Sequence, residues 1–166
     1  MFQSVVITMS YIIAIIVALL DQYTKALAIA KLKDGVGSVQ VFGDVLRFTY
    51  VENTGAAFGI FQNGNVVLTV ITAIILAGVL GAFIAMKPKS TLARSAAGLI
   101  MGGAVGNLID RVTRGFVVDF LDVRVINYPV FNIADSCVVV GAALICIYVI
   151  FSDEAKAKEK GKADEV

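Results

Sequence analysis

Long apolar runs without charge constrain this chain more than any other feature. From Asn65 to Met86 there is no charged side chain, and the run stops at Lys87. A helix that crosses the hydrocarbon core of a bilayer needs about 20 mostly apolar residues. In the whole chain 58% of the residues are hydrophobic and 16% are charged, which is more apolar surface than one small soluble core can bury. The sequence therefore predicts a membrane protein.

Three further runs predict spanning helices, over about residues 5–29, 91–111 and 132–151. The run 91–111 holds Gly102-Gly103-Ala104-Val105-Gly106, a small-x-x-x-small pattern that lets helices approach closely, so we expect this helix at the centre of a bundle. The expected fold is an all-α membrane protein with four transmembrane helices. Residues 1–152 would form its single domain, and residues 153–166 a charged, solvated and disordered tail.

A short segment between the first two helices has a different pattern. Residues 39–51 are rich in β-branched and aromatic side chains, and Gly43-Asp44 is a turn signal between two strand-like runs. We expect a small β-hairpin, or cradle, on the extracytoplasmic side of the membrane.

The first apolar run also has a feature of a cleaved signal peptide, because Ala28-Ile29-Ala30 has the small-x-small form of a cleavage site. A signal peptide would need a basic N-terminal region, which is absent. Asp21 and Lys25 would also lie between its core and its cleavage site. A spanning helix is the better interpretation.

Composition excludes several kinds of function. The formal net charge of +1 provides no field that would attract nucleic acid. The chain has no histidine, and its two cysteines, Cys137 and Cys146, lie about half a helical rotation out of phase. They can form neither a disulfide with each other nor a zinc site. We expect no metal and no other cofactor.

The distribution of positive charge suggests an orientation in the membrane. The 14 lysines and arginines divide evenly between the two ends of the four predicted helices. The short connection from Lys87 to Arg94 carries the denser positive charge, which favours a cytoplasmic position for it and for both termini.

The unusual polar residues all fall at the other end of the predicted bundle. They lie where helices one and three end, where helices two and four begin, and in the adjoining loops. Ionisable groups at membrane depth cost a few kcal/mol on insertion scales, so such a cluster indicates a functional site. Its members are Asp21, Lys25, Glu52, Asn53, Asn107, Asp110, Arg111, Asp119, Asp122, Asn132 and Asp135.

Several of these residues also have a structural interpretation. Asp21 and Lys25, four residues apart on one helix face, can form an ion pair or an interfacial anchor, and we place them behind the site. Asn107, Asp110 and Arg111 can bond to loops at a helix end, and Asn53 can shape a turn.

Two aspartates are the candidate reactive pair. Asp135 could serve only as a capping acid three residues after Asn132, at the start of the fourth helix. That role leaves Asp119 unexplained, since this second carboxylate stands in an apolar loop between Phe116 and Leu121. Asp119 could also pair with a nearby arginine.

Five sequence blocks, read together and in order, resemble the bacterial lipoprotein signal peptidases, also called signal peptidase II. Each block alone is weak, but together they cover the chain from Asp21 to Asp135, and no motif position departs from the family pattern. The blocks are Asp21-Gln22-Tyr23-Thr24-Lys25, Asn53-Thr54-Gly55-Ala56-Ala57-Phe58-Gly59, Gly102-Gly103-Ala104-Val105-Gly106-Asn107-Leu108-Ile109-Asp110-Arg111, Val117-Val118-Asp119-Phe120 and Phe131-Asn132-Ile133-Ala134-Asp135.

The resemblance implies an aspartic endopeptidase with a catalytic dyad at Asp119 and Asp135. It also implies a substrate, a prolipoprotein whose cysteine carries a diacylglyceryl group and which is cut on the N-terminal side of that cysteine. The site would lie near the outer face of the bacterial cytoplasmic membrane, in contact with lipid, and the peptide antibiotic globomycin would occupy it. We expect a monomer. The residues implied around the dyad are Asn53, Asn107, Asp110, Arg111, Asn132 and Asp21.

Two other functions fit some of these features. Buried acids could bind cations in a small ion or proton transporter, although no internal repeat is visible and the acids are confined to one end. A non-catalytic scaffold subunit could use the small residues of the third helix to pack on a partner.

Overall fold

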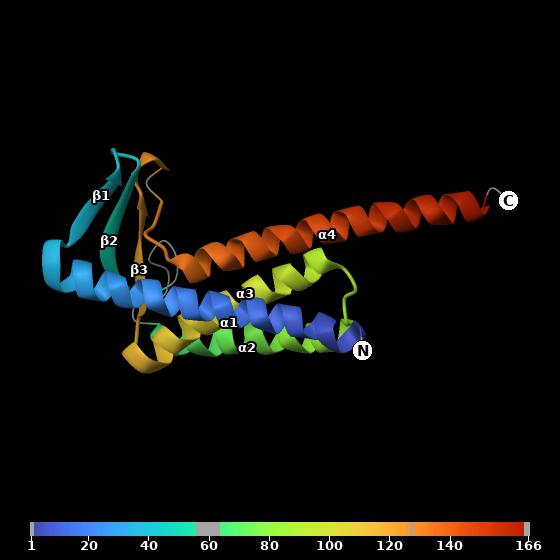
Figure 1. Cartoon of the computed structure of the whole chain (residues 1–166), viewed down its shortest axis with the longest axis horizontal. Coiled ribbons are helices and arrows are strands. Elements are labelled where there is room, and N and C mark those ends of the chain that lie inside the picture. Colours follow the sequence, from blue (N-terminus) through green and yellow to red (C-terminus); the bar gives the residue numbers. More distant parts are fainter. Residues whose placement is uncertain (1, 56–63, 127, 165–166) are drawn as a thin grey trace.

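The computed structural model describes residues 2–55, 64–126 and 128–164 of the chain. The described part is mostly helical, with one small sheet at one end of the helices (Figure 1). The four long helices are α1 (Phe2–Ala28), α2 (Asn65–Met86), α3 (Thr91–Arg114) and α4 (Ile133–Asp164). Each contains a segment long and apolar enough to cross a membrane. The predicted class of four-helix membrane protein is therefore confirmed.

Helix α3 lies at the centre, as its small residues predicted. It packs against α1, α2 and α4, and more of it is buried inside the protein than of any other described span. Its inner positions are alanines and glycines, such as Ala96, Ala97 and Gly102. The other spans keep many large apolar side chains exposed, among them Leu19 and Ile74. Such surfaces suit contact with lipid.

Helix α1 is an integral part of this bundle. A π-helical segment, η1 (Ile29–Val36), follows it directly and packs against the sheet. The Ser10 hydroxyl of α1 also donates a hydrogen bond of 3.0 Å to the Arg94 carbonyl of α3. These contacts argue against removal of α1 as a signal peptide.

The predicted hairpin is present, and it is part of a sheet of three strands. β1 (Ser38–Phe42) and β2 (Leu46–Asn53) are antiparallel and joined through a turn at Gly43, whose φ is +47°. β3 (Val117–Val123) pairs antiparallel with β2, with Val51 opposite Asp119. The sequence placed Asp119 in an apolar loop, which was wrong. A short 3-10 turn, η3 (Arg124–Ile126), ends this strand.

Burial of both faces of β3 explains why its apolar run gave no clear strand signal. Val118 and Phe120 point to one face, where they pack with Ala28 and Leu32 of α1 and η1. Asp119 and Val117 point to the opposite face. Both faces are covered, so most positions on either side are apolar. The two carboxylates of the strand, Asp119 and Asp122, lie on opposite faces.

At its far end α4 is longer than expected. It continues beyond Phe151 through the charged residues to Asp164, where the sequence predicted a disordered tail. Alanine, glutamate and lysine dominate this segment and all favour helices.

The close packing of α3 on α4 gives a test of the fold. A Cβ atom added at Gly103 would collide with the Ala134 carbonyl oxygen and would lie 2.8 Å from a methyl group of Val138. Gly103→Ala should therefore destabilise the protein by about 1–3 kcal/mol, as overpacking does, and should reduce activity because Ala134 adjoins Asp135. Thermal unfolding in detergent measures the first effect.

Gly81→Ala on α2 is the matched control, because nothing lies within 4 Å of its added Cβ. Alanine is the better helix former, so this variant should be as stable as the wild type or more stable. Equal unfolding temperatures for the two variants would contradict the packing described here.

Candidate active site

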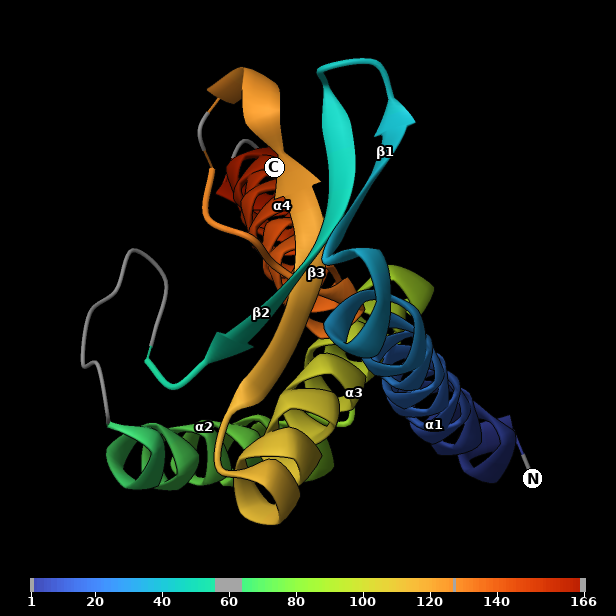
Figure 2. The same cartoon turned by 90° about the vertical axis from the view of Figure 1, so that its left-hand side faces the viewer.

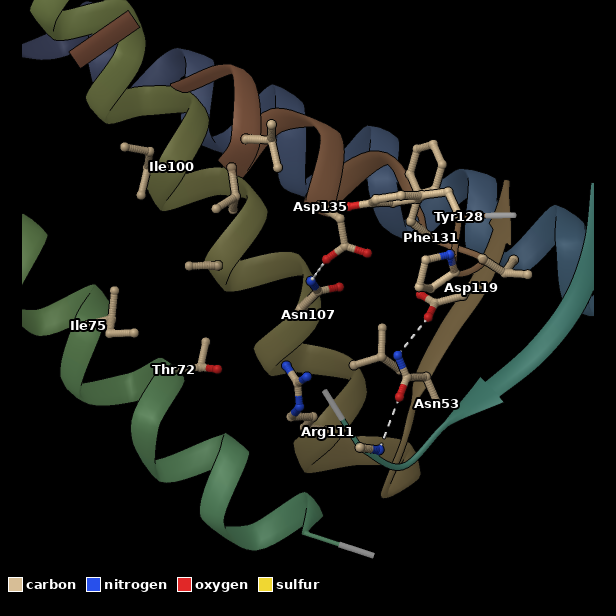
Figure 3. Close-up of a pocket in the computed structure, with 17 residues that line it drawn as sticks. Asn53, Thr72, Ile75, Ile100, Asn107, Arg111, Asp119, Tyr128, Phe131 and Asp135 are labelled. Carbon is tan, nitrogen blue, oxygen red and sulfur yellow. Dashed lines mark hydrogen bonds between the residues drawn. The ribbon is translucent and has the colours of Figure 1, made fainter. Parts of the chain in front are cut away.

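Asp119 and Asp135 line the same cavity, of about 360 Å³, at the sheet end of the helices (Figure 3). Asp119 comes from β3 and Asp135 from the first turn of α4. The cavity is otherwise lined by residues of β2, α2, α3 and the segment that precedes α4. We call it the dyad pocket. Its polar members are Asn53, Thr72, Asn107, Arg111, Asp119, Tyr128 and Asp135.

Asn132 connects the two carboxylates. Its side-chain Nδ2 donates a hydrogen bond of 2.6 Å to Asp119 Oδ1, and its backbone N–H donates one of 3.2 Å to Asp135 Oδ2. The Asp135 N–H donates in return to Asn132 Oδ1 at 2.9 Å. This reciprocal pair is a capping box at the start of α4. Asp135 thus caps its helix and faces the pocket at the same time.

Asn53 and Asn107 hold the other carboxylate oxygens. Asn53 Nδ2 donates to Asp119 Oδ2 at 2.8 Å, and Asn107 Nδ2 donates to Asp135 Oδ1 at 2.7 Å. Asn53 Oδ1 accepts from the Gly55 N–H at 3.0 Å, so the predicted turn role and a site role occur together. Ala56 to Gly59, which complete this sequence block, lie outside the described residues.

Asp119 is 1% exposed, and this burial shifts its titration. Burial and the nearby Asp135 carboxylate raise the pKa of Asp119 to about 7, although the hydrogen bonds from Asn53 and Asn132 act in the opposite direction. Removing a carboxylate from water penalises its charged form, and a second carboxylate adds repulsion. Asp119 therefore keeps its proton up to neutral pH.

Asp21, Lys25 and Asp110 lie behind the pocket and are completely buried. The Lys25 ammonium is 2.8 Å from Asp21 Oδ2 and 3.0 Å from Asp110 Oδ2. It also donates to Asn107 Oδ1 at 2.8 Å, so its three protons have three acceptors. None of these three ionisable residues lines the dyad pocket.

The two buried acids of this cluster, Asp21 and Asp110, accept hydrogen bonds from the backbone beside the dyad. Asp110 Oδ2 accepts from the Val118 N–H at 3.0 Å, one residue before Asp119. Asp21 Oδ1 accepts from the Ala134 N–H at 3.0 Å, one residue before Asp135. A single ion cluster thus positions both segments that carry the candidate reactive groups.

Arg111 lines the pocket, where Figure 3 shows its guanidinium on the α3 side. The sequence did not single out Gln22, which donates to the Gly106 carbonyl and to Asp110, both at 3.0 Å, and accepts from Arg114. It also missed Thr72, Tyr128 and Phe131 as pocket residues. Only Gln22 and Phe131 had a signal, since they lie inside sequence blocks with charged neighbours.

Two predicted polar residues lie away from the pocket. Glu52 pairs with Lys33 at 2.7 Å on the exposed side of β2. Asp122 accepts from the Thr49 hydroxyl at 3.0 Å within the sheet. Among the residues described, no three histidine, cysteine, aspartate or glutamate side chains are grouped so that they could hold a metal ion.

A sequence model of the family described as Signal peptidase (SPase) II matches residues 13–151. The chain belongs to the signal peptidase II family. It is therefore a multi-pass membrane peptidase, and neither the transporter nor the scaffold interpretation is favoured.

Known relatives of this signal peptidase II chain cover nearly its whole length. A lipoprotein signal peptidase of Halothermothrix orenii is 45% identical over 141 residues, which are 85% of this chain and 94% of that protein. One of Clostridium acetobutylicum is 40% identical over 151 residues, 89% of this chain and 97% of that protein.

Two solved structures of bacterial membrane enzymes are similar to this chain in fold and in sequence. A bacterial membrane enzyme determined by the in meso method at 2.3 Å resolution superposes with a TM-score of 0.81 and is 37% identical. The match covers 90% of this chain and 92% of that one. A second such enzyme, at 1.9 Å resolution, has a TM-score of 0.74 and 39% identity, over 86% of this chain and 92% of that one.

The buried ion cluster of this signal peptidase II predicts a large effect of one substitution. Lys25→Met leaves the buried Asp21 carboxylate without its cation and Asp110 with Arg114 alone, and breaking such a buried pair costs about 3–5 kcal/mol. We expect a markedly lower midpoint of chemical unfolding and loss of peptidase activity, because both dyad segments lose their anchors.

Lys33→Met is the matched control. Its ion pair with Glu52 is exposed on both sides, and exposed pairs contribute little to stability. The unfolding midpoint of this variant should stay close to that of the wild type. A similar loss in both variants would show that burial of the cluster is not what matters.

Proposed function

We propose that this chain cleaves the signal peptide from prolipoproteins whose cysteine carries a diacylglyceryl group, on the N-terminal side of that cysteine. The observation that carries the proposal is the convergence of Asp119 and Asp135 on one pocket, linked through Asn132, in a chain of the signal peptidase II family. The two carboxylates would act as an aspartic dyad on a bound water molecule.

The dyad supplies an acid and a base at the same pH. Because Asp119 keeps its proton up to about pH 7, it would donate that proton to the oxygen of the scissile carbonyl. The second carboxyl group, that of Asp135, would accept a proton from the water as it attacks the carbonyl carbon. The tetrahedral intermediate then collapses, and the leaving amine takes up a proton from the dyad.

The surrounding residues have distinct proposed roles. Asn53, Asn107 and Asn132 keep the two carboxylates oriented through the hydrogen bonds described above. Arg111, which lines the pocket, would donate hydrogen bonds to substrate carbonyl groups. Asp21, Lys25 and Asp110 would act through the backbone and through Asn107, without touching substrate.

The proposed orientation puts the dyad pocket near the extracytoplasmic face of the cytoplasmic membrane. The α2–α3 connection, with Lys87 and Lys89, and both termini lie at the end of the bundle opposite the sheet (Figure 1). Positive charge near the ends of spanning helices favours the cytoplasm. The three-stranded sheet would then stand outside the bilayer, beside the lipid-modified cysteine.

Two further properties belong to this proposal. The protein would act as a monomer, because one chain supplies every dyad-pocket residue named here. A globomycin-like peptide antibiotic would compete with the substrate for the dyad pocket. Measuring its inhibition against increasing precursor concentration would test for competition.

The dyad assignment predicts the effect of two conservative substitutions. Asp119→Asn and Asp135→Asn should each lower the cleavage rate of a diacylglyceryl-modified precursor by about 10³-fold or more, because the variant loses its acid or its base. Asp44→Asn is the control, since the Asp44 side chain is 95% exposed at the hairpin turn. Normal cleavage by either dyad variant would refute the assignment.

The raised pKa of Asp119 predicts the alkaline limb of the pH profile. Above about pH 7 Asp119 loses the proton that it must donate, so kcat/KM should fall as the pH rises through this value. Asn53→Ala removes a hydrogen bond that lowers the pKa of Asp119. The alkaline limb of that variant should move to higher pH, even if its maximal rate is reduced. A rate that stays constant from pH 6 to pH 9 would contradict this role of Asp119.

A further inference from the structure

A second cavity, of about 280 Å³, lies between α2, α3 and α4, farther from the sheet than the dyad pocket. Among the described residues that line it none is charged, and Tyr148 alone of them carries a hydroxyl group. We call it the inner groove. Ile100 of α3 lines both the inner groove and the dyad pocket, so the two spaces adjoin.

One face of α3 forms the floor of both spaces. The lining residues of this helix follow one another at intervals of four, three, four, three and four, the spacing of a single helix face. The face is apolar and mostly small along the inner groove and becomes polar only at the dyad. Its members are Ala93, Ala97, Ile100, Ala104, Asn107 and Arg111.

Helices α2 and α4 form the walls. On α2, Thr72 and Ile75 line the dyad pocket, and Val79 and Ala82 continue along the inner groove. On α4, Asp135 and Val138 line the first space, and Ile145 and Val149 line the second. Both helices pack on α3, and they lie on different sides of it in Figure 2. The result is a continuous track that runs from the dyad along the length of α3.

We propose that the inner groove binds the apolar helix of the signal peptide that precedes the scissile bond. This inference rests on the proposed function and extends it to the part of the substrate that is discarded. The groove would hold the precursor in the register that puts its cleavage site at Asp119 and Asp135.

Depth distinguishes a peptide helix from an acyl chain of the lipid-modified cysteine. Ala97 and Ala93 lie ten and fourteen residues before Asn107, which is about 15 Å and 21 Å along α3 at 1.5 Å per residue. Half of a hydrocarbon core is about 15 Å. An acyl chain anchored beside the dyad reaches about half of the hydrocarbon core. It would therefore end near the depth of Ala97 and would leave the groove beside Ala93 unfilled.

The apolar segment of a signal peptide has the matching length. Its 7–15 residues span about 10–22 Å as a helix, which covers the track from the dyad to Ala93. The alanines at positions 82, 93 and 97 leave room for a helix to approach closely. A groove without a charged side chain among its described lining residues also suits an uncharged segment, since no charge would be buried on either side.

Filling the groove gives the first test. Ala82→Trp puts a large side chain into the inner groove from an exposed position on α2. The purified full chain would be assayed on a full-length diacylglyceryl-modified precursor and on a short lipopeptide that has the cleavage site but no apolar segment. We expect the ratio of the precursor KM to the lipopeptide KM to rise about tenfold.

Ala77→Trp is the matched control. Ala77 is also exposed on α2, but it lies five residues away, about 140° around the helix, and does not line the groove. Its KM ratio should equal that of the wild type. An unchanged ratio in Ala82→Trp would overturn the proposal and would mean that bilayer lipid alone fills the groove. Failure of the wild type to cleave either substrate would count against the proposed function instead.

Cross-linking tests occupancy without requiring catalysis. In an Asp135→Asn background with Cys137→Ser and Cys146→Ser, a single cysteine would be introduced as Ile145→Cys in the groove or as Ile147→Cys outside it. The precursor would carry one free cysteine about ten residues before the cleavage site, at the depth of the groove. A disulfide should form with position 145 and not with position 147. Equal yields, or no product at position 145, would overturn the proposal.

Discussion

The buried ammonium of Lys25 is the interaction on which the rest of the site depends. It contacts Asp21 on its own helix and Asp110 and Asn107 on α3, all within 3.0 Å. Each carboxylate also accepts from a backbone N–H of another element, Val118 in β3 and Ala134 in α4, and Asp110 accepts in addition from Gln22 and Arg114. Without Lys25, Asp21 would be buried with no cation and Asp110 would keep only Arg114, and an uncompensated buried charge is far more costly than a buried ion pair. One positive charge therefore allows four separate chain segments to meet.

This arrangement solves a problem that any dyad of carboxylates presents. The two acids must be close enough to share a proton, yet their repulsion and burial oppose that approach. Here hydrogen bonds, and not the packing of the aspartate side chains, fix the positions of the two acids. The residue before each is fixed by a hydrogen bond, and amide groups from Asn53, Asn107 and Asn132 hold the carboxylate oxygens. The raised pKa of Asp119 is the remaining electrostatic strain, and it is the property that the proposed chemistry uses.

The sequence predicted the four helices, the central position of α3 and the hairpin because apolar runs, small-residue spacing and turn residues are local signals. It could not predict β3, because a strand that is covered on both faces has no alternation. It grouped the polar residues at one end of the bundle but could not separate the pocket residues Asn53, Asn107 and Arg111 from the buried Asp21, Lys25 and Asp110. Whether a residue lines the pocket or lies behind it depends on how α1 and α3 are rotated about their axes. That rotation is fixed only when the two helices pack together.

The packing that sets this rotation follows from glycines on α3. Gly98, Gly102 and Gly106 are spaced by four residues and face α1, and a Cβ atom at any of them would lie within 3.0 Å of an α1 atom. At Gly106 that atom is Asp21 Oδ2, so the absence of a side chain there gives Asp21 its place beside α3. Lys25, one turn further along, then reaches Asn107. Close helix approach through small residues thus brings the charge of α1 to the dyad. On another face of α3, the small side chains of Ala93 and Ala97 leave the inner groove open.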